Sequence, residues 1–450
     1  MLMKFNPTCL ELFVLIVACL QVYLYSKYHK RVIRWWCERR KRRRGARQLR
    51  PRDPSACPQC VGAVSWLVRR PTPHVVPWGE VKSRAGRPKT VDTSGYACLN
   101  VVCEYYGIAD ADVHALVSDG QRNGVQYWRC QACGGRKSSR LGTPLYRLKT
   151  PAQRVAMVMT ALAEGVDIAA ATRIFDHHHT TIQHWLERGG QHSARLHDRL
   201  LNKAVMAGHV QLDELVTKVK RDPERVWIWT AIDARSKLIM ALHVGRRTIG
   251  DACLLFHQLK QRLKPGCWPI FTSDGLNQYH YGMTAHYGHC EKPPRARKLH
   301  WFADARLQYA QLRKRRRGRK VDFLYSIIRL GDRGIIRATL RKLGFTGTVQ
   351  TAYVERSNLT LREHIAPLSR RTWSIAYDRY HLWLHIQWGL AYYHLIRPHQ
   401  ALRVHVRGPS RQRDRTPAMA AGLTSKRWTV ADLLHLPVPE NGEVTPFPVV

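Results

Sequence analysis

Three acidic residues in the second half of the chain have the surroundings of metal ligands. Asp213 lies in HVQLDELV and Asp274 in PIFTSDGL, each after a short apolar run rich in β-forming residues. Both carboxylates are therefore predicted at the ends of buried strands. Glu355 lies in TAYVERSNLTLR, whose spacing predicts a helix. Three ordinary surface charges are the alternative. We favour a site for two Mg²⁺ or Mn²⁺ ions, which carboxylate oxygens bind and which can clamp a phosphoryl transfer.

Neighbours of these acids complete the expected site. Asn358 and Arg362 follow Glu355 at i+3 and i+7, so the three should share one helix face. We expect Arg362 to contact a DNA phosphate and Asn358 to bond DNA or a neighbouring side chain. Glu214 directly follows Asp213, and alternation along a strand should send it to the opposite face, so we leave it out of the site.

The elements that must position these residues follow an α/β order. Residues 226–244 read as two apolar strands joined by a polar turn at 233–237. A helix over 248–263 then leads into the strand before Asp274. Strand, hairpin, helix, strand and late helix is the order of an RNase H-like nuclease core.

Paired cysteines predict a structural zinc site before this core. Cys98 and Cys103 form one close pair, and Cys130 and Cys133 form another. Two such pairs on two turns suit a tetrahedral Zn²⁺, and the spacing between them fits a β-ribbon. Cys57 and Cys60 read as half of a weaker or incomplete site.

Two further stretches are candidate DNA contacts. Residues 152–164, 168–175 and 180–195 read as three helices, a helix-turn-helix layout in which a plain helical spacer is the alternative. The expected base-reading residues are Thr180, Thr181, Gln183 and Arg188. The run Arg313–Lys320, with Arg315, Arg316 and Arg317, should contact phosphates, because it offers charge but no fixed geometry for reading bases. Arg87, in a Gly-Arg-Pro segment, is a weaker candidate for the minor groove.

Seven runs in order carry a family resemblance: QLDEL, WIWTAIDARSK, FTSDGL, LQYAQLRKRRRGRK, YVERSNLTLRE, YYHLIRPHQALR and RTPAMAAGLT. Together they resemble a bacterial insertion-sequence transposase of the DDE type, in the subgroup with a zinc ribbon and a helix-turn-helix. The resemblance implies an α/β fold with an RNase H-like core, and cleavage and joining of DNA at transposon ends. It also implies that Asp213, Asp274 and Glu355 are the catalytic triad.

Composition agrees with a polyanion partner. The 450 residues include 74 Lys and Arg against 32 Asp and Glu, a formal charge of +42. Such a charge favours a polyanion partner, and a ribosome-associated or generic RNA-binding protein is the alternative that the three acids speak against. The paired cysteines indicate a reducing compartment. The resemblance implies double-stranded DNA as the partner and a cytoplasmic, nucleoid-associated protein. Holding two DNA ends together implies a dimer or larger assembly.

The apolar stretch 9–25 is marginal as a membrane span, so a membrane tether and a buried helix both stay open.

These observations give a domain plan and two rival functions. We expect an apolar and basic segment over 1–50, a basic linker over 51–95, a zinc ribbon over 96–150, a helix-turn-helix domain over 151–205, a catalytic domain over 206–400 with a basic insertion at 291–350, and a tail over 401–450 that contacts another subunit. The rivals are a DNA-binding regulator with an inactive core and a cellular nuclease without strand transfer.

Overall fold

The structure is a computed structural model. It describes residues 75–81, 93, 96–98, 100, 102–108, 110–294, 298, 300–318, 320–405 and 412–438. The chain divides into two units, Met1–Cys60 and Val61–Val450, and all described residues belong to the second. Within the described residues, no helix has both the length and the apolar character needed to cross a membrane. The stretch 9–25, Cys57, Cys60 and Arg87 lie outside them.

The cysteine-rich part forms a small antiparallel sheet. Strands β1 (Leu116–Arg122) and β2 (Val125–Cys130) make a hairpin, and β3 (Arg136–Ser138) pairs with β2. This is the ribbon that the cysteine spacing predicts. Helix α2 (Trp78–Val81) lies in the range expected to be a linker, yet Trp78 contacts Tyr105 ring to ring at 5.6 Å. The Trp78 indole also donates to Gln131 Oε1 at 2.6 Å, so this segment belongs with the ribbon.

Three helices follow: α3 (Ala152–Ala163), α4 (Ile168–Phe175) and α5 (His179–Leu201). They begin close to the predicted positions, but α5 continues past the predicted end at residue 195. Asp167 caps α4 by accepting from the backbone N–H of Ala170 at 2.7 Å. Asp176 ends α4 with a left-handed φ of 53°, which turns the chain toward α5. The expected core face of α5, Ile182, Trp185 and Leu186, is buried. Ile182, Trp185 and Leu186 share one hydrophobic cluster with residues of the large sheet, including Val210 and Trp229.

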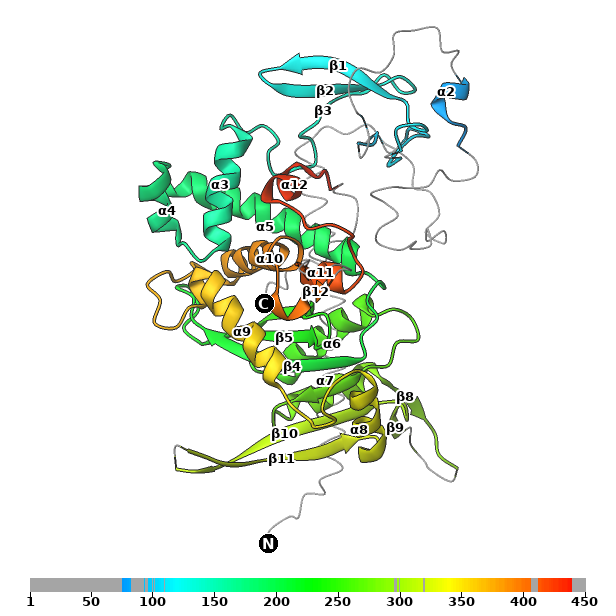
Figure 1. The fold of residues 1–450 in the computed structure, drawn as a ribbon, viewed down its shortest axis with the longest axis vertical. Helices are drawn as coiled ribbons and strands as arrows, with labels where there is room; N and C mark the ends of the chain where they lie inside the picture. The colour runs from blue at the N-terminus through cyan, green and yellow to red at the C-terminus, as the bar shows by residue number, and fades with distance from the viewer. Residues whose placement is uncertain are drawn as a thin grey trace. The chain divides into compact units, whose positions relative to one another are not determined.

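The larger sheet has six strands in the order β11-β10-β7-β4-β5-β6. Its strands are β4 (His209–Thr217), β5 (Val226–Asp233), β6 (Ile239–Gly245), β7 (Ile270–Ser273), β10 (Gln308–Arg317) and β11 (Lys320–Leu330). β4, β5 and β6 are antiparallel, β7 runs parallel to both β4 and β10, and β11 closes the edge antiparallel to β10. The fold is thus mixed α/β with a mixed sheet, as Figure 1 shows.

Helices cover this sheet. α6 (Ile249–Arg262) and α7 (Gln278–His286) follow β6 and β7, whereas α9 (Ala352–His364) and α10 (Arg379–Leu395) come late in the chain. The hydrophobic residues of α9 pack with β4 and β5, as Val354 and Leu361 share a cluster with Leu215 and Ile228. α10 lies against α5, where Gly190 approaches the backbone of Leu384 so closely that a side chain there would clash.

The basic stretch at 291–350 is not an insertion. It supplies β10 and β11 of the central sheet, and between β11 and α9 it forms α8 (Arg333–Lys342). β8 (Gly288–Glu291) and β9 (His300–Ala303) form a separate hairpin, and β9 lies within the same stretch. The expectation fails because a run of consecutive basic residues hides the alternation typical of a strand, while cross-strand pairing and burial at one end decide its conformation.

The last described segment packs on its own chain. It contains β12 (Val404–His405), β13 (Gln412–Arg413), α11 (Pro417–Ala420) and α12 (Val430–His435), with short 3₁₀ turns at Ala366–Leu368 and Gln400–Leu402 earlier. Thr429 caps α12 in a reciprocal bond pair with Asp432. The carbonyl of Leu433 lies 3.1 Å from Nε2 of the buried His192 in α5. Within residues 412–438 the tail therefore covers helices of the same chain.

Candidate functional site

Carboxylates gather where strands β4 and β7 meet. Ligand oxygens of Asp213, Glu214 and Asp274 all lie within 4.8 Å of one another. The parallel register pairs Leu212 with Ser273, so Asp213 and Asp274 each come one residue later. Asp274 lies just after the end of β7, as predicted, whereas the prediction that Asp213 ends a strand is wrong, because β4 continues to Thr217 in its pairing with β5. The sequence-predicted pair is thus brought together, and the set of three could hold a metal ion.

The expectation that alternation removes Glu214 from this site is wrong. The two neighbours do have partners on different sides: Asp213 accepts from Asn358 Nδ2 at 2.7 Å, whereas Glu214 accepts from the Tyr279 hydroxyl at 2.9 Å and pairs with Arg247. However, β7 stops at Ser273, and Asp274 lies beyond the strand end. With no β7 backbone beside them, both carboxylates reach Asp274.

The electrostatics of the cluster favour a bound cation. Burial, followed by the neighbouring charges of Glu214 and Asp274, raises the pKa of Asp213 to about 7. Burial and Asp274 also raise the pKa of Glu214, although the Arg247 guanidinium opposes the shift. Three close carboxylates repel one another when ionised. A divalent ion would relieve that repulsion.

Asn358 holds Asp213 in place. Its amide nitrogen donates to Asp213 Oδ2, and its carbonyl oxygen accepts from the Thr230 hydroxyl at 3.1 Å. The same hydroxyl lies 3.0 Å from the backbone carbonyl of Asp213. Asn358 is buried in α9, so in the structure it bonds a neighbour, one of the two roles expected for it.

Glu355 lies one helical turn before Asn358 but outside the acid cluster. Its Oε1 accepts from Lys314 Nζ at 3.0 Å and from the Thr351 hydroxyl at 3.1 Å. About half of the side chain is exposed. Arg362, on the same helix, donates to the carbonyl of Leu368 at 3.3 Å, and burial lowers its pKa. Both residues are thus bonded within the chain.

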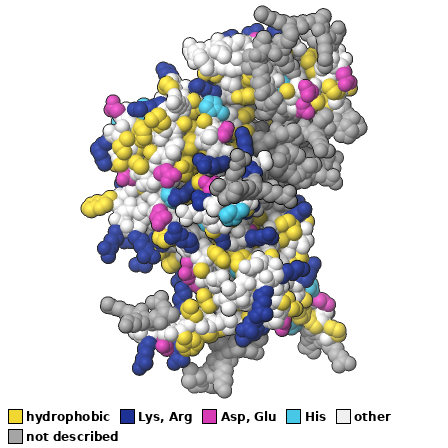
Figure 2. Space-filling model, viewed as in Figure 1, with side chains coloured by type: hydrophobic (Ala, Val, Ile, Leu, Met, Phe, Trp, Pro, Cys, Tyr) yellow, Lys and Arg dark blue, Asp and Glu magenta, His cyan; other side chains and the backbone are white. Residues whose placement is uncertain are grey.

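The basic run lies at the end of a β-hairpin, with residues 313–317 in β10. Arg315 and Arg317 are exposed on β10, while the side chain of Arg316 lies outside the described part of the protein. Lys314 and Arg313 precede them. Lys314 bonds Glu355, which lies outside the acid cluster, and Arg313 lies against Gly275, the residue after Asp274. Figure 2 shows Lys and Arg side chains on this part of the molecule, at the lower left.

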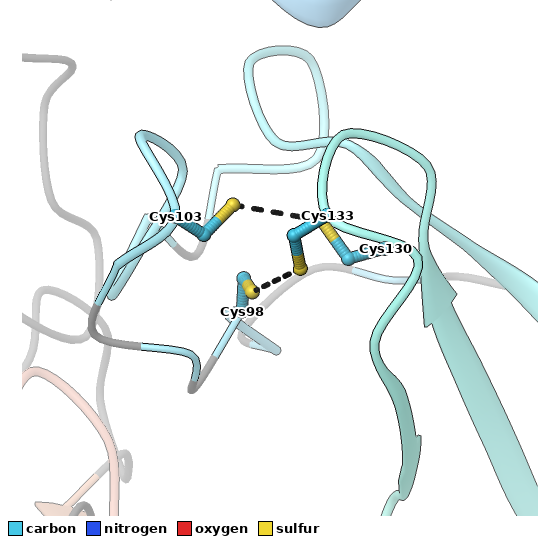
Figure 3. Close-up of side chains that lie close together, drawn as sticks. All are labelled: Cys98, Cys103, Cys130 and Cys133. Atoms are coloured by element: carbon cyan, nitrogen blue, oxygen red, sulfur yellow. Dashed lines mark hydrogen bonds between the residues drawn. The ribbon is translucent and has the colours of Figure 1, made fainter. Parts of the chain in front are cut away.

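The four predicted zinc ligands come together, as Figure 3 shows. Cys98 Sγ lies 3.7 Å from Cys133 Sγ, and Cys103 Sγ lies 3.9 Å from Cys130 Sγ. Tetrahedral Zn–S bonds of about 2.3 Å place sulfurs about 3.8 Å apart, so these spacings fit the ion. Burial raises the pKa of the Cys98 thiol. The cluster could therefore hold a metal such as zinc.

The residues predicted for base reading divide into two groups. Thr180 is exposed and Thr181 partly exposed at the start of α5. In contrast, Arg188 donates to the backbone carbonyl of Tyr146, and burial lowers its pKa. Gln183 donates to Glu187 at 3.3 Å. The first turn of α5 is therefore the more exposed group, although Thr180 Oγ1 lies 2.8 Å from His178 Nδ1.

Glu214 is the residue that sequence reasoning missed. Its signal was adjacency to Asp213 together with an aromatic and a basic residue, Tyr279 and Arg247, that lie far along the chain.

Neither a scan against models of protein families nor a search among curated proteins finds a match for this chain.

Proposed function

We propose that this chain is a DDE-type transposase, which binds transposon ends, cleaves them and joins the freed 3′-hydroxyl to target DNA. The observation that carries the proposal is the convergence of Asp213, Glu214 and Asp274, with ligand oxygens within 4.8 Å, where β7 ends beside the middle of β4. Acids from adjacent strands that converge in this way suit a metal-dependent phosphoryl transfer.

The order of elements supports the same proposal. Three antiparallel strands, a helix, a parallel strand and a late helix match the order that an RNase H-like core requires. The helices α3 to α5 would be the helix-turn-helix, and the cysteine-bearing sheet would be the zinc ribbon. Double-stranded DNA is the proposed partner, and pairing of two ends would need two or more copies.

The roles of the chain's residues follow from their contacts. Two divalent ions such as Mg²⁺, when bound, stabilise the attacking and leaving oxygens of the phosphodiester. Asp213, Asp274 and Glu214 would hold them. Asn358 fixes the orientation of Asp213. Arg313 and Lys314 border the acids and offer charge to the phosphates of a bound strand.

A cleavage assay on DNA that carries the element's ends tests the proposal. Wild-type protein with Mg²⁺ should release the 3′-hydroxyl ends, and Asp274→Asn should abolish this while duplex binding persists. Asp304→Asn is the matched control, because Asp304 pairs with Arg306 away from the acids and should leave cleavage unchanged. Cleavage by Asp274→Asn at the wild-type rate would refute the metal site.

A second function is favoured by one observation. Glu355, the third acid of the implied triad, is engaged by Lys314 instead of joining the cluster. If that arrangement persists on DNA and three acids of the triad are required, the protein is a DNA-binding regulator without activity. The same assay decides between the two, since a regulator binds the ends at every Mg²⁺ concentration and cuts none.

A further inference from the structure

One face of the β10–β11 hairpin carries arginine and aromatic side chains in alternation. The antiparallel register pairs Arg313 with Tyr325 and Arg315 with Phe323. Residues directly opposite each other in such a pair point to the same side of the sheet. The Arg315 guanidinium carbon lies 5.6 Å from the centre of the Phe323 ring, and the two aromatic rings lie 5.5 Å apart. We call these four residues the arginine–aromatic stripe.

The rings of the stripe are not core residues. Phe323 is 47% and Tyr325 is 42% exposed, and they stand on β11, the edge strand of the sheet. Asp322 and Leu324 point to the opposite face, because successive side chains on a strand alternate. The exposed face of the stripe thus combines aromatic surface with positive charge. Figure 2 shows hydrophobic and Lys or Arg side chains next to each other on this hairpin.

The stripe begins beside the acid cluster. Register pairs Gln311 with Ser273 at the end of β7, and Arg313 is the next residue of β10 on the same side. A side chain at Gly275 would lie only 3.1 Å from Arg313 Cδ, so the arginine rests on the residue that follows Asp274. Arg313 Nη2 also lies 3.5 Å from Asn277 Oδ1. From there the stripe runs outward along the hairpin, away from the acids.

We propose that the arginine–aromatic stripe binds an unpaired stretch of a DNA strand whose neighbouring phosphate occupies the acid cluster. Bases stack on Phe323 and Tyr325, and Arg313 and Arg315 contact the backbone. Every base offers a flat face to an aromatic ring, and this stacking is how proteins hold single strands without regard to sequence. An intact duplex keeps its bases stacked on one another and offers no such face. A second copy of the chain fits poorly, since it also carries the charge of +42.

The inference rests on the proposed function, and a binding experiment without added Mg²⁺ separates the two. The probes are a mixed-sequence single strand containing 2-aminopurine and a duplex of the same length, each titrated with full-length protein. The double variant Phe323→Leu/Tyr325→Leu should bind the single strand about ten-fold more weakly and lose the quenching of 2-aminopurine. Duplex affinity should stay within about two-fold, because the phosphate contacts remain.

Matched variants make the result interpretable. Phe302→Leu removes an aromatic ring that is 41% exposed on β9, outside the stripe, and should bind both probes as the wild type does. Arg315→Gln should weaken both probes, since it removes charge. Unchanged single-strand affinity in the double variant, equal losses on both probes, or a changed sedimentation mass would each overturn the stripe as a strand-binding surface. If the wild type binds neither probe, the proposed function itself fails; if it binds duplex alone, only this inference does.

Discussion

At the level of single residues, the carboxyl of Asp213 should tie stability to pH. Its pKa in the folded protein is raised to about 7, above the unfolded value of about 4. Such a group stabilises the fold while it is protonated, and that contribution is lost as the pH rises from about 4 through about 7. Without added Mg²⁺, the Tm of the wild type should therefore decline over this window, and that of Asp213→Asn should decline less. Thermal melting across pH measures both.

The same melting experiment has an internal check. A ligand that binds only the folded state stabilises it by an amount that grows with the logarithm of its concentration relative to its Kd. Mg²⁺ should therefore raise the Tm of the wild type at about pH 8 and that of Asp213→Asn much less. Identical pH profiles and identical Mg²⁺ shifts for the two proteins would show that this carboxyl is neither buried nor a ligand.

Glu214 and Glu355 compete for the place of third acid. Because Glu214 already lies with Asp213 and Asp274, Glu214→Gln should weaken Mn²⁺ binding about ten-fold, whereas Glu355→Gln should leave it near wild type. Titration of Mn²⁺ followed by its EPR signal measures this. The opposite ranking would mean that Glu355 leaves Lys314 and turns toward the acids when metal binds.

Asp213 and Asp274 could be predicted from the sequence, whereas the rest of the site could not. Asp274 follows an apolar run and lies just after the end of β7, whereas Asp213 lies within β4, which continues to Thr217. The two residues meet because β4 and β7 are parallel neighbours in the sheet. Alternation along β4 wrongly excludes Glu214 from the site. It predicts the face of the sheet from which a side chain leaves the backbone, but not whether the side chain can reach Asp274 beyond the end of β7. The bond from Lys314 to Glu355 depends on β10, which the arginine-rich sequence concealed.

At the level of elements, the cysteine-bearing sheet should depend on zinc. Cys103→Ser should abolish the zinc content of the purified protein, because a closed four-sulfur site tolerates no missing ligand. Cys290→Ser, which changes an exposed cysteine on β8, is the control and should retain one ion per chain. Elemental analysis of the full-length proteins measures this, and zinc retained by Cys103→Ser would contradict the site.

Two groups of residues on helix α5 should differ in role, one in DNA recognition and the other in stability. Arg188→Ala should reduce the free energy of unfolding by about 1–3 kcal/mol, since it leaves the Tyr146 carbonyl without its donor. Thr180→Ala/Thr181→Ala should instead reduce discrimination between the true end and a scrambled end. Denaturant unfolding and competitive binding measure the two effects, and a loss of discrimination without destabilisation in Arg188→Ala would reverse these roles.

The helices themselves were predictable to within a few residues. Gly165 marks the end of α3 in the sequence and Asp167 marks the start of α4, because local capping residues decide where helices begin and end. Which face of α5 is free was harder to predict. The sequence pattern predicts that Arg188 is a surface residue. In the structure, however, Arg188 donates a hydrogen bond to the backbone carbonyl of Tyr146, in the segment after β3.

For the whole molecule, one hydrophobic cluster joins parts that the sequence suggested were separate domains. It runs from Leu145 through α3 and α5 to Phe271 in β7 and on to Val438 near the end of the described chain. The first turn of α5 and the acid cluster are therefore anchored in the same core. A DNA end held by one would be positioned with respect to the other.

The net charge of +42 implies that DNA affinity falls steeply with salt, because each neutralised phosphate releases counterions. Arg315→Gln/Arg317→Gln should make the slope of log affinity against log salt shallower by about 0.9 per lost contact, or about 1.8 together. Lys426→Gln/Arg427→Gln removes the same charge from an exposed segment near α12 and should leave the slope unchanged. Duplex titrations at several salt concentrations measure both. Equal slopes in the two variants would mean that the hairpin contributes only through the net charge of the protein. A direct phosphate contact, in contrast, depends on the position of the charge.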